Sequence, residues 1–579
     1  MTKRLMLAMG LWFILLFVMM HIFSEEPRPQ QDQPYDTNTQ AQTAERPPVN
    51  SEDRFAREVL RVAQDDRPEQ ITIVRTENFE VSLNTLDASV SALKLLQYSE
   101  AGEPINFIER NISDYANFRV GFNGFDIDEP PSAQWAHRQA GELEHVFTHA
   151  ITSGYGQGLL LEKRYKFYEN AWHFDLELRL VNTNGERWYS HREEKSLAYR
   201  DIGYSLVWGS PIDWLVDKDA RSAFDTLSLV VYHPGNDKLV RINKNEEVKS
   251  FRWIGLEDRY FLFSVIPLSQ GNDGQNLVET ASVRVAEYSD RIAHQFSVNR
   301  HKLTLSAGGE MNDVYRIFLG PKKYSLLTDK TYDPYRLGAI FDNFVLVKWL
   351  EIAFELLMLF IYDFISNYAI VIIIVTILIK ILLHPLTKKS LVSMKKMQVL
   401  QPKMAVLKEQ FKADPKRLNE EMMKLYKKEG VNPLGGCLPM LLQLPVFIAL
   451  YQVLPRMADL KNVSFLWIND LSSPDTVATI SAFRDIPLLP YNINILPIIM
   501  VAFSVLQVKM SMAKKDTGPG DAVQQQQAKM MMIMPILFLL LFWNMPSGLV
   551  LYWTVQTIMS ILQQMYINRK YDMETAQPA

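Results

Sequence analysis

Cysteine is almost absent from this 579-residue sequence, which has one, Cys437. A single cysteine excludes an internal disulfide, so any exported part of the chain must be stabilised by its hydrophobic core. Cys437 also has no partner at metal-ligand spacing, and we expect no metal site. A P-loop, an HExxH motif and a glycine-rich dinucleotide fingerprint are missing too. We therefore expect no cofactor.

An excess of charge of either sign is also missing. The net charge is -4 and the pI is 6.3. This balance argues against a protein whose whole surface binds nucleic acid, and we expect no direct nucleic-acid recognition. The sequence does contain long apolar runs, and its length is sufficient for several domains at roughly 100–200 residues each.

The most informative apolar run is Ala369–Leu386. At about 1.5 Å per residue it is roughly 27 Å long, close to the thickness of a bilayer core, so we expect it to span a membrane. It contains Lys380, and an ammonium group at that depth costs about 2.5–3.5 kcal/mol unless it has water or a partner. Thr376 lies four residues earlier on the same helix face. Lys380 is thus either a functional residue in a polar environment or a lysine that reaches the membrane surface.

The N-terminus has its own apolar run, Leu5–Phe23, preceded by Lys3 and Arg4. No small-x-small cleavage site follows it, so we interpret residues 1–23 as an uncleaved transmembrane anchor with a cytoplasmic N-terminus. Residues 24–70 are poor in large apolar side chains, and we expect a disordered tether outside the membrane.

Residues 71–336 contain short runs with alternating polarity, separated by turn-forming residues. This period of two predicts a large all-β sandwich in the exported part of the chain. Glu169, His173 and Asp175 could line a sugar-binding cleft, but polar residues on the solvated face of a strand have the same pattern. We favour the solvated face.

Residues 337–365 are apolar but contain five charged residues. Charges at that frequency are typical of an amphipathic helix in the outer membrane interface, not of a membrane span.

Residues 387–430 predict a basic helical hairpin. From 388 to 430 there are twelve basic and five acidic residues, a net charge of +7, which places the hairpin in the cytoplasm. The hairpin is either a determinant of membrane topology or a docking surface for partners, and the candidate docking residues are Lys395, Lys396, Lys403 and Lys408.

Four more apolar stretches follow, at 434–454, 488–510, 530–545 and 549–567. The charges of the intervening loops agree with six spans in total and two cytoplasmic termini, the second being a short tail at 568–579. The predicted fold class is a multi-domain membrane protein. Its five-helix transmembrane core and N-terminal anchor are all-α, and the exported sandwich is all-β.

The later spans contain two sets of notable side chains. Polar residues at Gln443, Ser504, Gln507, Thr554, Gln556 and Thr557 either form hydrogen bonds between helices or, with Lys380 and Thr376, line a wet cavity. Soft apolar side chains form either a surface that receives varied apolar segments or ordinary lipid-facing filler: Met440, Leu444, Phe447, Met534 and Phe538.

Three motifs occur in order along the chain: LQPK at Leu400–Lys403, NPLGGC at Asn432–Cys437 and PSGLVLY at Pro546–Tyr552. With these motifs, the chain from about Leu337 to Ile567 resembles the YidC-type membrane protein insertases, which include mitochondrial oxidase-assembly and chloroplast homologues. The preceding anchor and sandwich resemble the Gram-negative form of the family, which lies in the bacterial inner membrane and has a large domain in the periplasm.

The resemblance implies an insertase that is not an enzyme and uses no cofactor. Its core helices would enclose a hydrophilic groove whose cation draws the polar segment of a client inward, while the apolar segment slides along the third and fifth spans. Lys380 stands where the bacterial family typically has arginine. Thr376, Gln443, Tyr552, Trp553 and Gln556 are the expected groove-lining residues. The expected partners are nascent membrane proteins, ribosome–nascent-chain complexes, the Sec translocon and the lipid bilayer.

Two other functions remain possible from the sequence. A secondary transporter would use Lys380 as a coupling or substrate site, although no pair of internal repeats is visible. A membrane-anchored carbohydrate-binding protein would use the sandwich, whose fold the resemblance relates to sugar mutarotases.

Overall fold

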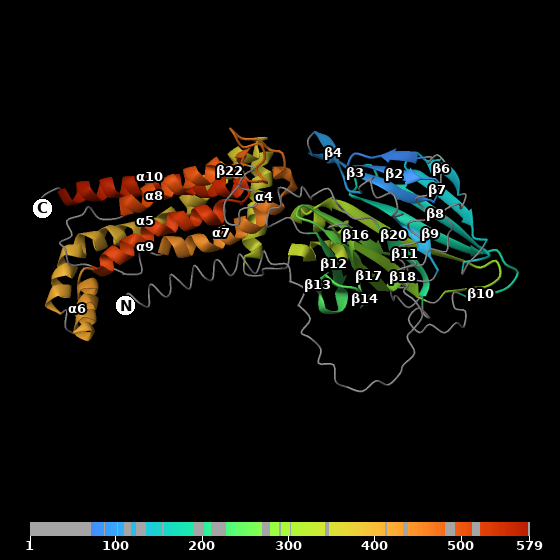
Figure 1. Ribbon diagram of the computed structural model, residues 1–579, viewed down its shortest axis with the longest axis horizontal. Coiled ribbons are helices and arrows are strands. Elements are labelled where there is room, and N and C mark those ends of the chain that lie inside the picture. Colours follow the sequence, from blue (N-terminus) through green and yellow to red (C-terminus); the bar gives the residue numbers. More distant parts are fainter. Residues whose placement is uncertain are drawn as a thin grey trace, which may run out of the picture. The chain divides into compact units, whose positions relative to one another are not determined.

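The computed structural model describes residues 71–85, 87–100, 102–108, 117–122, 135–152, 156–189, 202–209, 227–268, 278–288, 291–301, 303–341, 347–411, 414–431, 438–480, 492–511 and 522–576. These residues form two compact units, a β-rich unit that ends before 343 and a helical unit that follows (Figure 1). The expected anchor at 1–23, the tether at 24–70 and the motif at Asn432–Cys437 lie outside the described residues.

The β-rich unit confirms the predicted all-β domain. Among the described residues its largest sheet has nine antiparallel strands. In spatial order they are β13 (Lys238–Ile242), β12 (Ser228–His233), β15 (Trp253–Glu257), β16 (Phe261–Pro267), β20 (Glu310–Pro321), β9 (His173–Asn182), β8 (Leu159–Phe167), β7 (Glu144–Ala150) and β6 (Ala136–Gly141).

Smaller sheets complete this unit. A second sheet has the order β14 (Glu246–Lys249), β17 (Val278–Tyr288), β18 (Arg291–His301), β11 (Ile202–Trp208) and β5 (Arg119–Gly121). A third contains β1 (Ile71–Arg75), β2 (Phe79–Asn84), β3 (Ser89–Glu100) and β4 (Glu103–Asn106), and a short pair joins β10 (Trp188–Tyr189) to β19 (Thr304–Leu305).

The core lies between the sheets and is aromatic. Trp208 of β11 packs against Phe263 of β16 with ring centroids 4.1 Å apart, and Phe118 contacts Phe174 of β9 edge-on at 6.1 Å. All four side chains are buried. Large rings contribute much buried apolar area, which stabilises a domain without disulfides.

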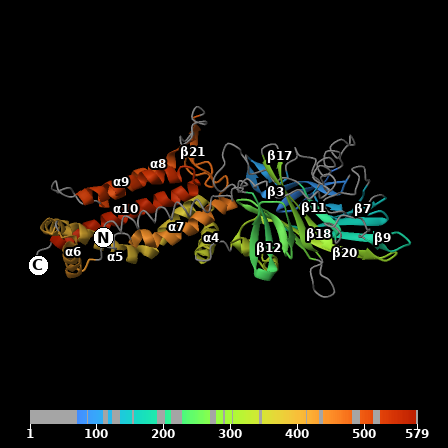
Figure 2. The same ribbon diagram turned by 60° about the horizontal axis from the view of Figure 1, so that its bottom comes forward.

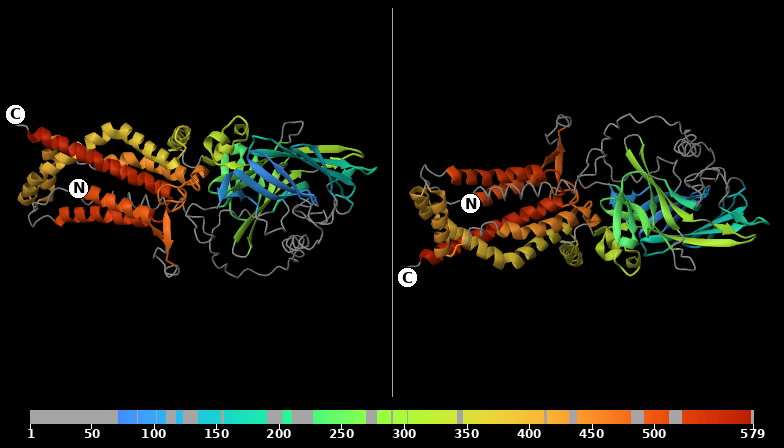
Figure 3. Two further views of the ribbon diagram at one scale, coloured as in Figure 1. Left: turned by 90° about the horizontal axis from the view of Figure 1, so that it is seen from above. Right: turned by 90° about the horizontal axis from the view of Figure 1, so that it is seen from below.

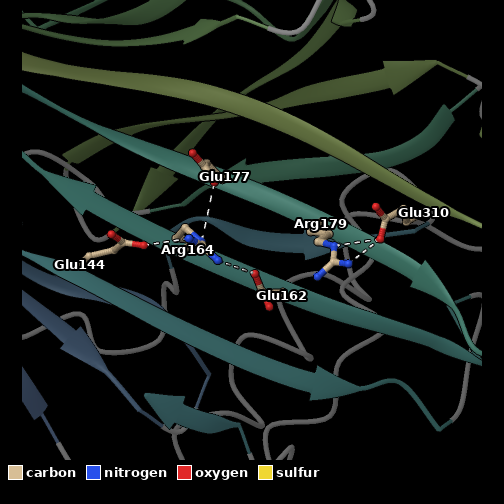
Figure 4. Close-up of polar contacts among 6 residues, drawn as sticks. All are labelled: Glu144, Glu162, Arg164, Glu177, Arg179 and Glu310. Atoms are coloured by element: carbon tan, nitrogen blue, oxygen red, sulfur yellow. Dashed lines mark hydrogen bonds and ion pairs between the residues drawn. The ribbon is translucent and has the colours of Figure 1, made fainter. Parts of the chain in front are cut away.

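The other face of the nine-stranded sheet carries charge (Figure 4). Arg164 lies 2.8 Å from Glu144 and 3.4 Å from Glu162, and Arg179 lies 2.5 Å from Glu310. Because these pairs are partly or largely exposed, each contributes little stability, but together they keep this face solvated. This is the alternation that the period of two predicted.

His173 and Asp175 are exceptions, and our interpretation of them as solvated is wrong. Asp175 is buried and accepts hydrogen bonds from both Nε and Nη2 of Arg316, at 2.9 Å each. His173 is buried, and its Nδ1 is hydrogen-bonded to the hydroxyl of Tyr332 at 2.9 Å. Tyr332 belongs to a later segment that packs on the sheet, so the two strand residues are covered. Glu169 is exposed.

That covering segment contains α3 (Tyr324–Leu327) and the 3₁₀-helices η2 (Asp333–Tyr335) and η3 (Leu337–Phe341). Its apolar side chains, including Leu337 and Phe341, are buried in one cluster with Trp253 and Phe318 of the sheet. The expected interfacial helix at 337–365 therefore began too early. Residues 337–341 pack on the β-rich unit, and the helix α4 begins at Lys348.

The helical unit contains α4 (Lys348–Tyr362), α5 (Tyr368–Gln410), α6 (Pro415–Lys428), α7 (Leu438–Arg456), α8 (Ile495–Ser511), α9 (Ala522–Phe542) and α10 (Ser547–Ala576). The 3₁₀-helix η5 (Ala458–Leu460) and the strand pair β21 (Thr476–Thr479) and β22 (Asn492–Asn494) lie between α7 and α8. Figure 2 shows α8, α9 and α10 lying lengthwise beside one another.

Helix α5 is longer than we expected. The sequence predicted that the span ends near Pro385, but the helix continues through this proline to Gln410. A proline inside a helix removes one backbone hydrogen bond, and it can bend the helix without ending it when the flanking turns are held in place. Among the described residues, Tyr368–Met397 within α5 is the one stretch long and apolar enough to cross a membrane; Ile495–Met510 and Met532–Phe542 are shorter apolar helices.

Local caps set the ends of these helices. The side chain of Asn367 accepts hydrogen bonds from the backbone N–H groups of Ala369 and Ile370, so α5 begins there. Asp414 caps α6 in the same way, and Pro415 follows it at the first helical position. The end of α5 and α6 form a hairpin in which Lys403 lies 2.9 Å from Glu429.

His294 predicts how the β-rich unit responds to acid. Burial lowers the pKa of His294 to about 4, and its Nδ1 has no hydrogen-bond partner among the described residues. Below pH 6.5 the unfolded chain binds a proton that the folded ring excludes, so stability falls as the pH drops toward 4. Between pH 7.5 and 4.5 the free energy of unfolding of His294→Leu should therefore fall by about 2–3 kcal/mol less than that of the parent.

The measurement is urea unfolding of a fragment of residues 71–341 at the two pH values. If the variant and the parent lose the same free energy of unfolding, His294 does not titrate as its burial implies.

Candidate functional site

The candidate site lies in the helical unit, where α10 packs against α5, α8 and α7. The views from above and below show α10 running the length of this unit (Figure 3). Gly548 at the start of α10 lies near Ile372 of α5, and Ser560 lies near Lys380. Since residue numbers rise together along both helices, α5 and α10 are parallel. Their polar side chains can therefore meet at successive levels.

Lys380 contacts α10 directly. Its Nζ donates a hydrogen bond to the Oγ of Ser560 at 2.7 Å, and the Ser560 hydroxyl donates to the backbone carbonyl of Gln556 at 2.9 Å. None of the ion pairs among the described residues includes Lys380. The ammonium group is thus turned inward to a neutral hydroxyl and has no carboxylate partner there.

Gln443 and Tyr552 form a second polar contact, between α7 and α10. The Gln443 amide donates a hydrogen bond to the Tyr552 hydroxyl. Tyr552 is buried, whereas Gln443 is partly exposed. This contact brings together two of the residues that the sequence predicted to line one groove.

Trp553 is the centre of an aromatic cluster. Its ring centroid lies 5.1 Å from that of Phe447 on α7, 5.3 Å from that of Phe538 and 5.2 Å from that of Phe542, both on α9. The rings tie three helices together. Phe447 and Phe538, two of the five residues proposed for an apolar slide, therefore have one edge of their rings packed inside the bundle.

The other proposed slide residues differ in exposure. Leu444 and Met534 are partly exposed, and nearby Ile533, Ile536 and Leu540 on α9 are exposed. The side chain of Met440 lies outside the described residues. An exposed apolar stripe on α9 is compatible with contact to lipid or to an apolar client segment.

Hydroxyl groups inside the bundle bond to their own helices. Thr376 is buried and donates to the carbonyl of Ile372 at 2.6 Å, and Thr554, Thr557 and Ser504 make the same kind of bond four residues back. Such bonds satisfy the hydroxyl proton without water. Thr376 therefore lines no open surface here, although it lies one turn from Lys380. Gln556 is partly exposed on α10.

A third polar contact of α10, again with α5, was not predicted from the sequence. The Gln563 amide nitrogen lies 3.0 Å from Nδ1 of His384 and 2.7 Å from Oγ1 of Thr387. The spacing contains a signal that could have found it. Thr376, Lys380 and His384 recur every four residues on α5, and Gln556, Ser560 and Gln563 recur every three or four on α10.

The opposite end of α10 is tightly tied to the loop after α7. The backbone N–H groups of Ser547 and Gly548 donate to the carbonyls of Ser473 and Leu471, both at 2.8 Å. The Ser547 hydroxyl donates to the carbonyl of Asp470 at 2.8 Å. A Cβ on Gly548 would come within 3.0 Å of the Leu471 carbonyl oxygen, so this close approach favours glycine.

Helix α4 is attached to the bundle by charge. Nη1 of Arg456, at the end of α7, lies 2.9 Å from Glu351, and its Nη2 lies 3.6 Å from Glu355. Both glutamates are buried, while Trp349, Leu356 and Phe360 are exposed on the other side of α4. Glu351 and Glu355, whose charges argued against a membrane span in this segment, thus face the protein.

The basic hairpin presents its lysines to the outside. Lys396 and Lys403 are exposed and Lys395 is partly exposed, whereas the side chain of Lys408 lies outside the described residues. Lys403 is paired with Glu429 across the hairpin, so part of the charge is neutralised locally.

Comparisons with known proteins cover nearly all of the chain. Residues 360–575 match the family described as 60Kd inner membrane protein, and residues 71–348 match the YidC periplasmic domain. The membrane protein insertase YidC of Pelobacter propionicus is 30% identical over 98% of this chain and 99% of its own. That of Syntrophus aciditrophicus is 32% identical, covering 87% of this chain and 85% of its own.

Solved structures are more distant. An active YidC insertase crystal structure, 18% identical, covers 86% of this chain and 92% of its own with a TM-score of 0.33. A galactose mutarotase-like protein from Lactobacillus casei, 9% identical, covers 43% of this chain and all of its own with a TM-score of 0.30. At these scores the structures add nothing to the sequence matches.

Arg456 allows a test of how α4 is held. Arg456→Met would leave Glu351 and Glu355 buried without a cation, which costs about 3–5 kcal/mol. We expect a clear drop in the thermal unfolding temperature of the full chain in detergent.

Two further variants make that test specific. Adding Glu351→Gln and Glu355→Gln to Arg456→Met should restore most of the loss, and Lys416→Met, which removes an exposed cation, is the control. Equal melting of Arg456→Met and the parent would show that the cluster contributes no stability.

Proposed function

Because the chain belongs to the YidC family of membrane protein insertases of the inner membrane, we propose that it admits the polar leading segment of a client through a hydrophilic groove centred on Lys380. The observation that carries the proposal is the contact of Lys380 with Ser560. An ammonium group in an apolar helix is costly, and a hydroxyl compensates only part of that cost. A client carboxylate would compensate more.

The physical advantage of such a groove is that the client's polar segment crosses a shorter stretch without hydration. A polar segment that crosses lipid alone must lose its hydration over the whole hydrocarbon core, at several kcal/mol per unsatisfied group. Lys380 would offer the segment a polar partner at one depth, and Gln443 with Tyr552 would offer another, so that no single stretch of the crossing is long. The client's apolar segment would move along α7 and α9 into lipid, past Leu444 and Met534, which are partly exposed, and past Met440. Phe447 and Phe538, which pack against Trp553, would support this proposed slide from inside the bundle.

Lysine at this position changes the mode of recognition. A guanidinium binds a carboxylate through two parallel hydrogen bonds, whereas an ammonium acts as a compact point charge. We infer attraction that depends on charge and distance but little on the orientation of the carboxylate.

Our proposed topology has six spans, with the sandwich in the periplasm and both termini in the cytoplasm. The parallel direction of α5 and α10 supports it, because both helices would then run from the periplasmic to the cytoplasmic side. The net charge of +7 after α5 favours the cytoplasm for the hairpin. The exposed apolar side of α4 favours contact with the outer leaflet.

The family implies nascent membrane proteins as clients and the bilayer as surroundings. We propose further that ribosome–nascent-chain complexes deliver clients to the hairpin, through Lys395, Lys396, Lys403 and Lys408, and that the protein acts alone or with the Sec translocon. The rival functions, transport of a solute and carbohydrate binding by the sandwich, find no support in the comparisons. His173 and Asp175 also use their polar atoms within the fold.

Substitutions at Lys380 separate charge from shape. Lys380→Arg should keep activity, Lys380→Met should lose it and Lys380→Glu should lose more. Attraction between unit charges about 4 Å apart is of order 4 kcal/mol at an effective dielectric of 20, so the defect should be largest for clients with acidic translocated tails. The measurement is insertion of one client with acidic or neutral tails into proteoliposomes.

The control for that series is Lys389→Met, which removes an exposed lysine from the same helix. A lysine that only reaches for the membrane surface would be neutral or stabilising when changed to methionine. Equal insertion of both tails by Lys380→Met would overturn the proposed role of the charge.

Deletion of Met404–Lys424 tests the hairpin. It should abolish insertion while the protein still reaches the membrane, because it removes the docking surface and not a span. Lys395→Gln with Lys396→Gln and Lys403→Gln keeps the helices and should weaken binding of ribosome–nascent-chain complexes in a salt-dependent way. Unchanged insertion after the deletion would leave the hairpin with a topogenic role alone.

A further inference from the structure

The contact of Gln563 with His384 and Thr387 determines which atoms carry protons. The Thr387 hydroxyl donates to the backbone carbonyls of Leu383 and His384, at 3.0 and 3.1 Å. A hydroxyl has one proton, so its oxygen can only accept from Gln563. The nitrogen of the Gln563 amide, not its oxygen, must therefore face Thr387.

The orientation of the amide then determines the tautomer of His384. The same amide nitrogen lies 3.0 Å from Nδ1 of His384, so it donates its second hydrogen atom to that nitrogen. A hydrogen atom on Nδ1 would instead point at the N–H group of Gln563, and two donors would then face each other. Nδ1 is then the acceptor and the hydrogen atom lies on Nε2, for which none of the hydrogen bonds of the described residues provides an acceptor.

The position of His384 relates it to Lys380. It lies four residues further along α5, on the same helix face and about 6 Å toward the hairpin. Its side chain is partly exposed, as is that of Gln563. A polar segment that enters from the hairpin side would reach Nε2–H of His384 before it reaches the ammonium group.

We propose that His384 is a second recognition residue for the client's polar segment. Gln563 and Thr387 hold it as a hydrogen-bond donor, so that a carboxylate or backbone carbonyl is bound there before Lys380. The inference rests on the proposed groove. Gln563 acts through His384 and is a positioning residue.

The first test is spectroscopic and concerns the tautomer. The full chain, labelled with ¹⁵N in its histidine rings and placed in lipid bilayers, should show one resonance pair that disappears in His384→Phe. That pair should report hydrogen on Nε2. In Gln563→Leu the ring should become a mixture of both neutral tautomers. A pair that reports hydrogen on Nδ1 in the parent overturns the positioning argument.

The second test is insertion of clients with acidic and neutral tails. His384→Phe, which keeps a ring but no donor, should reduce insertion of the acidic client about two- to tenfold, as expected for one hydrogen bond. His384→Asn should restore much of it because it again offers an N–H group. Failure of His384→Asn to restore a loss, with normal amounts of protein in the membrane, would indicate that the ring only packs the helices.

Lys380→Met in the same assay keeps the two hypotheses apart. If Lys380→Met loses activity while His384→Phe does not, the proposed role of His384 is wrong and the proposed role of the Lys380 charge is supported. If neither variant discriminates between the tails, the groove charge itself fails.

Discussion

An unpaired ammonium group inside a helix bundle requires polar atoms around it, and this requirement shapes the contact between α5 and α10. Lys380 would be expelled or neutralised in a wholly apolar seam. Ser560 provides one acceptor, and Gln563, His384 and Thr387 continue the polar contact toward the hairpin. Other contacts hold α10 in place: the aromatic cluster of Trp553 joins it to α7 and α9, and the backbone bonds of Ser547 and Gly548 attach its start to the loop after α7.

The sequence was sufficient where a single helix or strand carries the information. The depth of Lys380 in its apolar run and the alternation of the strands both follow from local periodicity. The resemblance then grouped Gln443 with Tyr552, and the structure does place them in contact.

The sequence was insufficient where a distant segment decides. His173 and Asp175 have the spacing of solvated strand residues, but Tyr332 and its neighbours, some 160 residues later, cover them. Ser560 has the pattern of a serine that bonds to its own helix, and its second contact depends on α10 being parallel to α5. Pro385 carries a local signal to end a helix, and the packed bundle overrides it.

The uninterrupted course of α5 has a mechanical consequence. A helix from Tyr368 to Gln410 is about 64 Å long, and roughly two thirds of it extends beyond Lys380. A stiff rod of this kind converts a push on the basic hairpin into a tilt at Pro385, where a backbone hydrogen bond is missing. A tilt of about 5° at Pro385 moves the far end of the helix, about 38 Å away, by about 3 Å. Lys380 lies close to Pro385 and moves much less, so a partner that arrives at the hairpin would change the surroundings of Lys380 in small steps.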